Sequence, residues 1–126
     1  MDIYLYFLSQ KGPMRILDKQ ITLEELKETA AGSFGDMVKA VVDTERVLLA
    51  IDAELHSDLE ALLLGNGSAQ HNLWGINLYP DLAGVDLVEF DSLINLRPSN
   101  GNTSRGVDDE STRGKIRSVV EQWIKE

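Results

Sequence analysis

The chain has 126 residues, of which 43% are apolar and none is cysteine, and its formal net charge is −9. This length and apolar fraction fit one globular domain with a packed core, and the lack of cysteine excludes disulfides, iron–sulfur clusters, Cys-rich zinc sites and thiol nucleophiles. Because nucleic-acid binding draws on Lys and Arg, the acidic balance argues against nucleic acid as the main partner, and no apolar run is long enough to span a bilayer.

The first thirteen residues differ in pattern from the rest. An apolar run, Ile3–Leu8, leads into the breaker-rich segment Ser9–Pro13, and a second methionine, Met14, follows. This pattern fits either an added edge strand or an extension, and we favour an extension at residues 1–13 before a single domain at residues 14–126. The run lacks a basic flank and a small-residue cleavage site, so it is not typical of a signal peptide and a cytoplasmic protein is expected.

A helix is predicted from Leu23 to Ala31. Thr22 and Glu25 have the spacing of a capping box, in which the Thr22 hydroxyl accepts from the Glu25 N–H and the Glu25 carboxylate returns to the Thr22 N–H. Gly32 favours the end of this helix.

From Met37 onward the apolar period changes to two residues, which is typical of strands with one solvated face. The predicted strands are residues 37–43, Val47–Leu55, Leu59–Leu64, Leu73–Tyr79 and Leu87–Leu96. The leucines between positions 55 and 63 also have helical spacing, so a helix stays open for that stretch.

The C-terminal segment predicts an amphipathic helix. Its apolar residues recur at helical spacing from Ile116 to Ile124, and the acids at positions 108–110 suit its N-terminus. The fold class predicted is α+β, an antiparallel sheet of about four or five strands with an N-terminal helix and a C-terminal amphipathic helix packed on one sheet face.

One segment has the composition of a metal or acid–base site. Asp52, Glu54, His56 and Asp58 alternate with other residues, so a strand would present all four on one face. Carboxylates with an imidazole can ligate a divalent cation, and histidine also serves as a general base. Neighbouring positions on one strand face are ~7 Å apart, so the four cannot converge without a bulge. A structural or solvated role is therefore favoured, and no cofactor is predicted.

The polar loop before the last helix is a second candidate. It contains Arg97, Asn100, Asn102 and Arg105, and two guanidinium groups near a helix N-terminus can bind an anion or a partner. Three acids at positions 108–110 occupy the place an anion would take. We therefore favour a self-satisfied loop whose arginines bond to nearby carboxylates or carbonyls.

Segments along most of the chain carry a resemblance to known proteins: Glu54–His56, Glu60–Leu64, Gly67–Ser68, Leu73–Pro80, Glu89–Pro98, Gly101–Asn102, Ser104–Val107 and the last helix. In this order they resemble a small family of bacterial and archaeal proteins classed as a domain of unknown function. The resemblance covers roughly residues 23–124 and implies a single compact domain found in cytoplasmic prokaryotic proteins. It implies no activity and no site residue.

The charge distribution supports a first functional hypothesis. Residues 47–96 contain eight acidic side chains and no Lys or Arg, and a sheet face of one sign can attract a basic protein partner. The same pattern is typical of a solvated sheet face that discourages aggregation. Because no catalytic constellation is present, we predict a non-enzymatic interaction or regulatory module, of which an antitoxin that neutralises a basic partner is one version.

The alternative hypothesis is a small-molecule or metal-dependent enzyme. It would use Asp52, Glu54 and His56, with Arg97 or Arg105 holding an anionic substrate. It requires the predicted strands Val47–Leu55 and Leu87–Leu96 to lie side by side, so that Glu89 and Asp91 join the cluster. The sequence leans away from an enzyme, predicts no membrane partner and leaves a homo-oligomer open.

Overall fold

The computed structural model describes residues 14–126, so the extension predicted at residues 1–13 lies outside the described residues. Five strands form one sheet in the order β1-β4-β3-β5-β6, in which every neighbouring pair is antiparallel. The strands are β1 (Arg15–Ile16), β3 (Val38–Asp43), β4 (Leu48–Ile51), β5 (Leu73–Leu78) and β6 (Val88–Glu89). A separate parallel pair joins β2 (Ile21–Thr22) to β7 (Ile124–Lys125).

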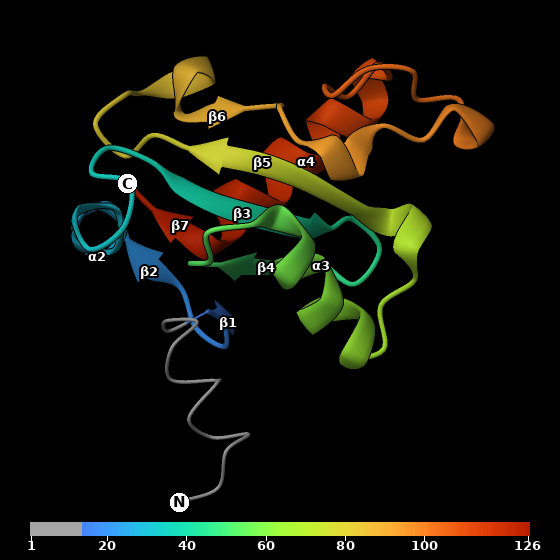
Figure 1. The fold of residues 1–126 in the computed structure, drawn as a ribbon. Coiled ribbons are helices and arrows are strands. Elements are labelled where there is room, and N and C mark those ends of the chain that lie inside the picture. Colours follow the sequence, from blue (N-terminus) through green and yellow to red (C-terminus); the bar gives the residue numbers. More distant parts are fainter. Residues whose placement is uncertain (1–13) are drawn as a thin grey trace, which may run out of the picture.

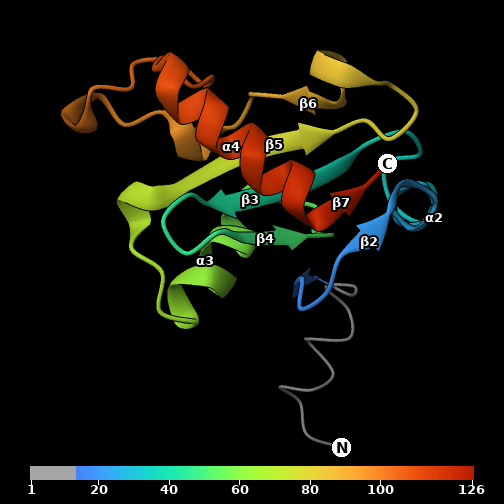
Figure 2. The same ribbon diagram turned by 180° about the vertical axis from the view of Figure 1, so that it is seen from behind.

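Within residues 14–126, three α-helices lie around the sheet. They are α2 (Leu23–Ala31), α3 (His56–Gly65) and α4 (Glu110–Trp123), and 3-10 turns cover Gln70–Asn72, Gly84–Leu87, Leu93–Asn95 and Pro98–Asn100. Helix α3 lies on one face of the sheet and α4 crosses the other (Figures 1 and 2). The α+β prediction, with its antiparallel sheet and its terminal helices, is confirmed. None of the helices in residues 14–126 is long and apolar enough to cross a bilayer.

The alternation of side chains along β3 divides the core into two parts. Ala40 and Val42 pack with residues of α2 and α4, whereas Val41 points to the opposite face and packs against Leu59 and Leu63 of α3. All five side chains are fully buried. Both faces of the sheet are therefore covered where α3 and α4 lie.

The N-terminal helix begins where its capping pattern predicts. The Thr22 hydroxyl accepts a hydrogen bond from the Glu25 N–H at 3.1 Å, and the helix ends before Gly32. At the other end of the chain, Asp109 caps α4 by accepting from the Thr112 N–H at 2.9 Å. At the start of both helices, a side-chain oxygen accepts from a backbone N–H that has no partner within the helix, and this hydrogen bond fixes where the helix begins.

The strand predicted at Leu59–Leu64 is wrong, because these residues belong to α3. Leu59 and Leu63 are four residues apart and fully buried against the sheet, whereas Ala61, which would share their face on a strand, is exposed. The strand predicted at Val47–Leu55 is too long: β4 ends at Ile51, because Asp52 adopts φ 77° and turns the chain away.

The strand predicted at Leu87–Leu96 is also too long. Only Val88 and Glu89 pair with β5, and the chain then enters the 3-10 turn Leu93–Asn95. The side chain of Asn95, and not a backbone strand, bonds to Gly75 beyond the end of β6. The Asn95 side chain therefore takes the place of a strand partner at Gly75, and the backbone pairing of β5 with β6 stops at Glu89.

Candidate functional site

The four residues proposed as a metal or acid–base cluster do not share a strand face. Asp52 lies in the loop after β4, Glu54 is exposed in that loop, His56 is the first residue of α3, and Asp58 lies in the first turn of that helix. Within residues 14–126 no group of three or more His, Asp or Glu is placed to hold a metal ion. The geometric basis for that cluster, a continuous strand, is therefore wrong.

Asp52 instead lines an open cleft of about 360 Å³ between β1, α2 and the loop after β4. Arg15, Glu25 and Glu28 also line this cleft. Burial raises the pKa of Asp52, and the charge of Arg15 opposes that rise. Asp52 therefore shares this cleft with side chains of α2, and His56 is not part of its lining.

His56 is buried between α3 and the sheet. Its Nε2 lies 2.8 Å from the carbonyl oxygen of Ile76, and 8% of the residue is exposed. Burial lowers the pKa of His56 below its ordinary 6.5, and the hydrogen bond to Ile76 acts in the opposite direction. The lowered pKa favours the neutral form of the imidazole.

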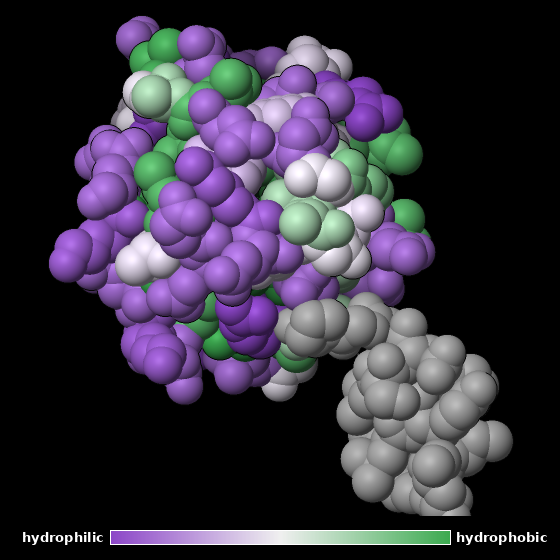
Figure 3. Space-filling model, turned by 90° about the vertical axis from the view of Figure 1, so that its left-hand side faces the viewer, coloured by the Kyte–Doolittle hydropathy of each residue, from purple (hydrophilic) through white to green (hydrophobic). Residues whose placement is uncertain are grey.

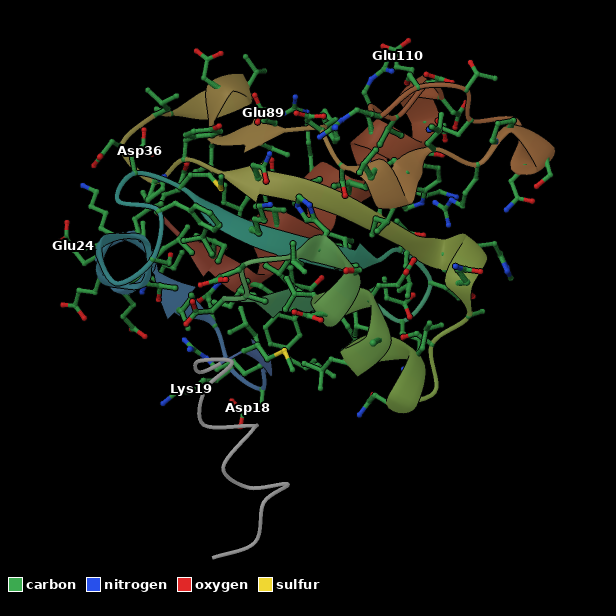
Figure 4. The ribbon with its side chains drawn as sticks, viewed as in Figure 1. Asp18, Lys19, Glu24, Asp36, Glu89 and Glu110 are labelled. Carbon is green, nitrogen blue, oxygen red and sulfur yellow. The ribbon has the colours of Figure 1, made fainter. Side chains whose placement is uncertain are left out.

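A row of polar side chains crosses the same face of the sheet beside His56. Asn77 on β5 is aligned with Glu89 on β6, and its amide nitrogen donates to Glu89 Oε1 at 2.8 Å. The Tyr79 hydroxyl donates to the same oxygen at 3.1 Å. Burial, this bond and the nearby carboxylates of Glu89, Asp36 and Asp91 raise the pKa of Tyr79. Figure 4 shows Asp36 and Glu89 at the same end of the sheet.

Asn77 and Tyr79 are not among the site residues that the sequence predicts. Both alternate with the buried Ile76 and Leu78 along a predicted strand, so they could have been placed on one sheet face. Their pairing with Glu89 depends on the register between β5 and β6, which no local pattern reveals. The enzyme alternative requires Glu89 to lie beside the Val47–Leu55 strand, but β3 and β5 separate β4 from β6.

The two arginines proposed to bind an anion both have partners in the chain. Arg97 donates to the carbonyl oxygens of Gln70 at 2.6 Å and Leu73 at 2.8 Å, and its guanidinium stacks 4.3 Å from the Trp74 ring centroid. Burial lowers its pKa. Arg105 pairs with Asp91 at 2.7 Å. These contacts engage both terminal nitrogens of Arg97 and the Nε of Arg105 with partners inside the chain.

The two asparagines of the same loop differ. Asn102 is buried and its amide nitrogen donates to the carbonyls of Asn95, Ser104 and Gly106, while its oxygen accepts from the Asp108 N–H at 2.8 Å. Asn100 is exposed on the 3-10 turn before Gly101. Asn102 therefore stabilises the loop through these hydrogen bonds. The residues predicted to bind an anion do not gather around it.

One surface that combines exposed apolar and acidic side chains lies on two adjoining loops. We call residues 32–37, between α2 and β3, and residues 79–87, between β5 and β6, the acidic loop surface. It carries the exposed apolar side chains Phe34 (42% exposed), Leu82 (48%) and Val85 (70%).

Three acids, Asp36, Asp81 and Asp86, lie among these apolar residues, and the two segments contain no Lys or Arg. Lys27 of α2 reaches Asp81 at 3.8 Å, which brings the helix to the second loop. Figure 3 looks onto this side of the molecule, which is mainly hydrophilic with separate hydrophobic patches.

Comparison with known proteins identifies a family. The model of the family described as "Protein of unknown function (DUF5674)" matches residues 15–123. No curated protein and no solved structure matches the chain. The matched range runs from the start of β1 to the end of α4, and it confirms the resemblance to a domain of unknown function. Because this range covers most of its length, the chain belongs to the DUF5674 family.

Proposed function

We propose that the protein is a non-enzymatic interaction module that binds a basic protein through the acidic loop surface. The carrying observation is the mixture of Phe34, Leu82 and Val85 with three acids on two adjoining loops whose own residues include no Lys or Arg. Cations of neighbouring elements contact this surface at Asp81, Phe34 and the Val85 carbonyl, through Lys27, Lys39 and Arg117 respectively. Apolar side chains contribute burial free energy on binding, and the acids select a partner of opposite charge. An antitoxin that neutralises a basic partner is one version of this function.

The position of the acids supports this surface over the sheet face expected from the sequence. On the sheet face, Glu89 is engaged by Asn77 and Tyr79, and Asp91 by Arg105. Asp36 and Asp86, by contrast, make no side-chain ion pair with the described residues. Their charges are available to a partner.

The enzyme alternative has less support. Asp52 faces a cleft beside α2, His56 bonds to a backbone carbonyl, and Arg97 and Arg105 have partners of their own. Acid–base chemistry needs these groups to converge on one substrate. Their separation favours a binding role.

The test compares three forms of the chain as bait in a lysate of its own source cells. One is wild type; the second is Asp36→Asn/Asp81→Asn/Asp86→Asn. The third, Asp18→Asn/Glu45→Gln/Glu110→Gln, removes the same charge from exposed sites elsewhere, and Figure 4 shows Asp18 and Glu110 far from Asp36. We expect wild type and the third form to retain the same basic protein at ~0.1 M salt and to lose it at ~0.5 M salt, where charges are screened more strongly.

The second form should bind at least ~10-fold more weakly than wild type, which corresponds to about 1.4 kcal/mol. If the second form retained the same protein as wild type, the partner would bind at another surface and the proposal would be overturned. Capture of only acidic or neutral proteins, equal loss in the second and third forms, or no specific capture at all would each overturn the proposal.

A further inference from the structure

His56 and Asn77 lie together on the α3 side of the sheet, where hydrogen-bond acceptors outnumber donors. His56 is 8% exposed, and its Nε2 lies 2.8 Å from the Ile76 carbonyl oxygen. Because a carbonyl only accepts, Nε2 carries the single proton of the neutral imidazole. The neutral ring therefore has no second N–H to donate.

Asn77 provides an acceptor that lacks a donor. The residue is 6% exposed, and its amide nitrogen donates to Glu89 Oε1 at 2.8 Å and to the Asp91 carbonyl at 3.4 Å. Its Oδ1 is buried and receives no hydrogen bond, and the Asn77 side chain is close enough to His56 to raise the pKa of the imidazole. A buried acceptor without a donor costs free energy, which a second imidazole N–H beside it would recover.

We propose that His56 and Asn77 form a proton-operated link, in which protonated His56 donates its second ring N–H to Asn77 Oδ1 and so joins the start of α3 to β6 through Glu89. The ring takes one proton from solvent, one hydrogen bond forms, and no covalent bond changes. The link is independent of the partner-binding role proposed above, because none of its residues belongs to the acidic loop surface.

Charges on each neighbouring element determine the pH at which the link forms. The charged side chains around His56 are Lys39 on β3, Asp58 on α3, Glu89 on β6, and Asp91 with its partner Arg105 after β6. Burial and Lys39 lower the pKa of His56, whereas the Ile76 carbonyl, Asn77 and Asp91 raise it. Since the lowering effects dominate, the link is open at pH 7 and forms as the pH falls below 6.5.

The first test uses the wild-type chain and NMR between pH 8 and pH 4.5. The side-chain amide signals of Asn77 should shift with the same midpoint as the His56 ring nitrogens, because the amide oxygen gains a donor when the ring is protonated. Asn95 is the internal control: its amide is also buried, but it already bonds to Gly75 through both groups. Its signals should not follow the His56 midpoint.

The second test changes the acceptor. Asn77→Asp places a carboxylate beside the ring and should raise the His56 midpoint by about 1 pH unit or more, since an adjacent opposite charge favours the protonated form. Asn100→Asp adds the same charge at an exposed position in the 97–109 loop and is the matched control. Equal shifts of the His56 midpoint in the two variants would overturn the link, as would Asn77 amide signals that do not move with His56 in the wild type.

Discussion

The side chain of Asn95 pairs with the backbone of Gly75 in the way a neighbouring strand would. Asn95 Oδ1 accepts from the Gly75 N–H at 2.8 Å, and Asn95 Nδ2 donates to the Gly75 carbonyl at 2.9 Å. The same nitrogen donates to the Arg105 carbonyl at 2.9 Å. One buried amide therefore connects β5, the 3-10 turn Leu93–Asn95 and the loop that leads to α4.

Replacing Asn95 by alanine should lower the free energy of unfolding by about 1–3 kcal/mol, because the Gly75 N–H is left buried without an acceptor. Chemical denaturation measured by circular dichroism checks this. Asn100→Ala removes the same side chain from an exposed position and should change stability by less than about 0.5 kcal/mol. Equal effects of the two substitutions would mean that the pairing with Gly75 contributes nothing specific.

Gly75 itself should not tolerate a side chain. A Cβ at this position would lie 2.5 Å from the Ser92 Cβ and 2.6 Å from its Oγ, and Ser92 is 1% exposed. Gly75→Ala should therefore destabilise the fold by about 1–3 kcal/mol through overpacking.

Gly114→Ala is the matched control for Gly75→Ala. A Cβ at Gly114, in the middle of α4, meets no atom within 4 Å, so alanine there should stabilise the fold by about 0.5–1 kcal/mol. The two glycine-to-alanine substitutions should thus shift the thermal midpoint in opposite directions. If both variants shifted the thermal midpoint in the same direction, Ser92 would be moving to accommodate the new Cβ at position 75 without loss of stability.

The sequence predicts the elements that depend on local signals. Thr22 and Glu25 lie where their spacing places them, and the apolar stripe from Ile116 to Val120 is buried in α4. The segment Leu59–Leu63 fits both a strand and a helix locally, and only packing against β3 decides for the helix. Local patterns are ambiguous wherever tertiary burial makes the choice.

The candidate sites were harder to predict than the fold, because they depend on contacts between distant segments. Asn95 bonds to Gly75 across 20 positions, and His56 bonds to Ile76 across the same separation. Neither contact has a sequence signature, since Asn and His are common in loops. The register between β5 and β6, which aligns Asn77 with Glu89, is likewise a property of the assembled sheet.

Stability should depend on pH through His56. Burial holds the pKa of the folded-state imidazole below its ordinary 6.5, so the unfolded chain takes up a proton first as the pH falls. The His56 contribution is complete above pH 6.5 and is lost as the pH falls from 6.5 toward the folded-state pKa. Urea denaturation at several pH values should show this decline in wild type and in His71→Gln, which alters an exposed histidine, but not in His56→Gln. A parallel decline in His56→Gln would assign the effect to other groups.

Arg97 should stabilise the loop more than Arg105 does. Arg97→Ala removes hydrogen bonds to the carbonyls of Gln70 and Leu73 and the stacking on Trp74, so we expect a loss of about 1–3 kcal/mol. Arg105→Ala removes an ion pair with Asp91 whose side chains are 54% and 46% exposed, and such pairs contribute about 1 kcal/mol or less.

Arg97→Lys distinguishes the stability contributed by the positive charge from that contributed by the planar guanidinium group. Lysine keeps the positive charge but lacks the planar fork that reaches two carbonyls while it stacks on an indole. This variant should therefore recover less than about half of the stability lost in Arg97→Ala, as measured by urea denaturation. Full recovery by lysine would show that charge alone accounts for the effect, and a loss in Arg97→Ala no larger than that in Arg105→Ala would contradict a structural role for the Arg97 contacts.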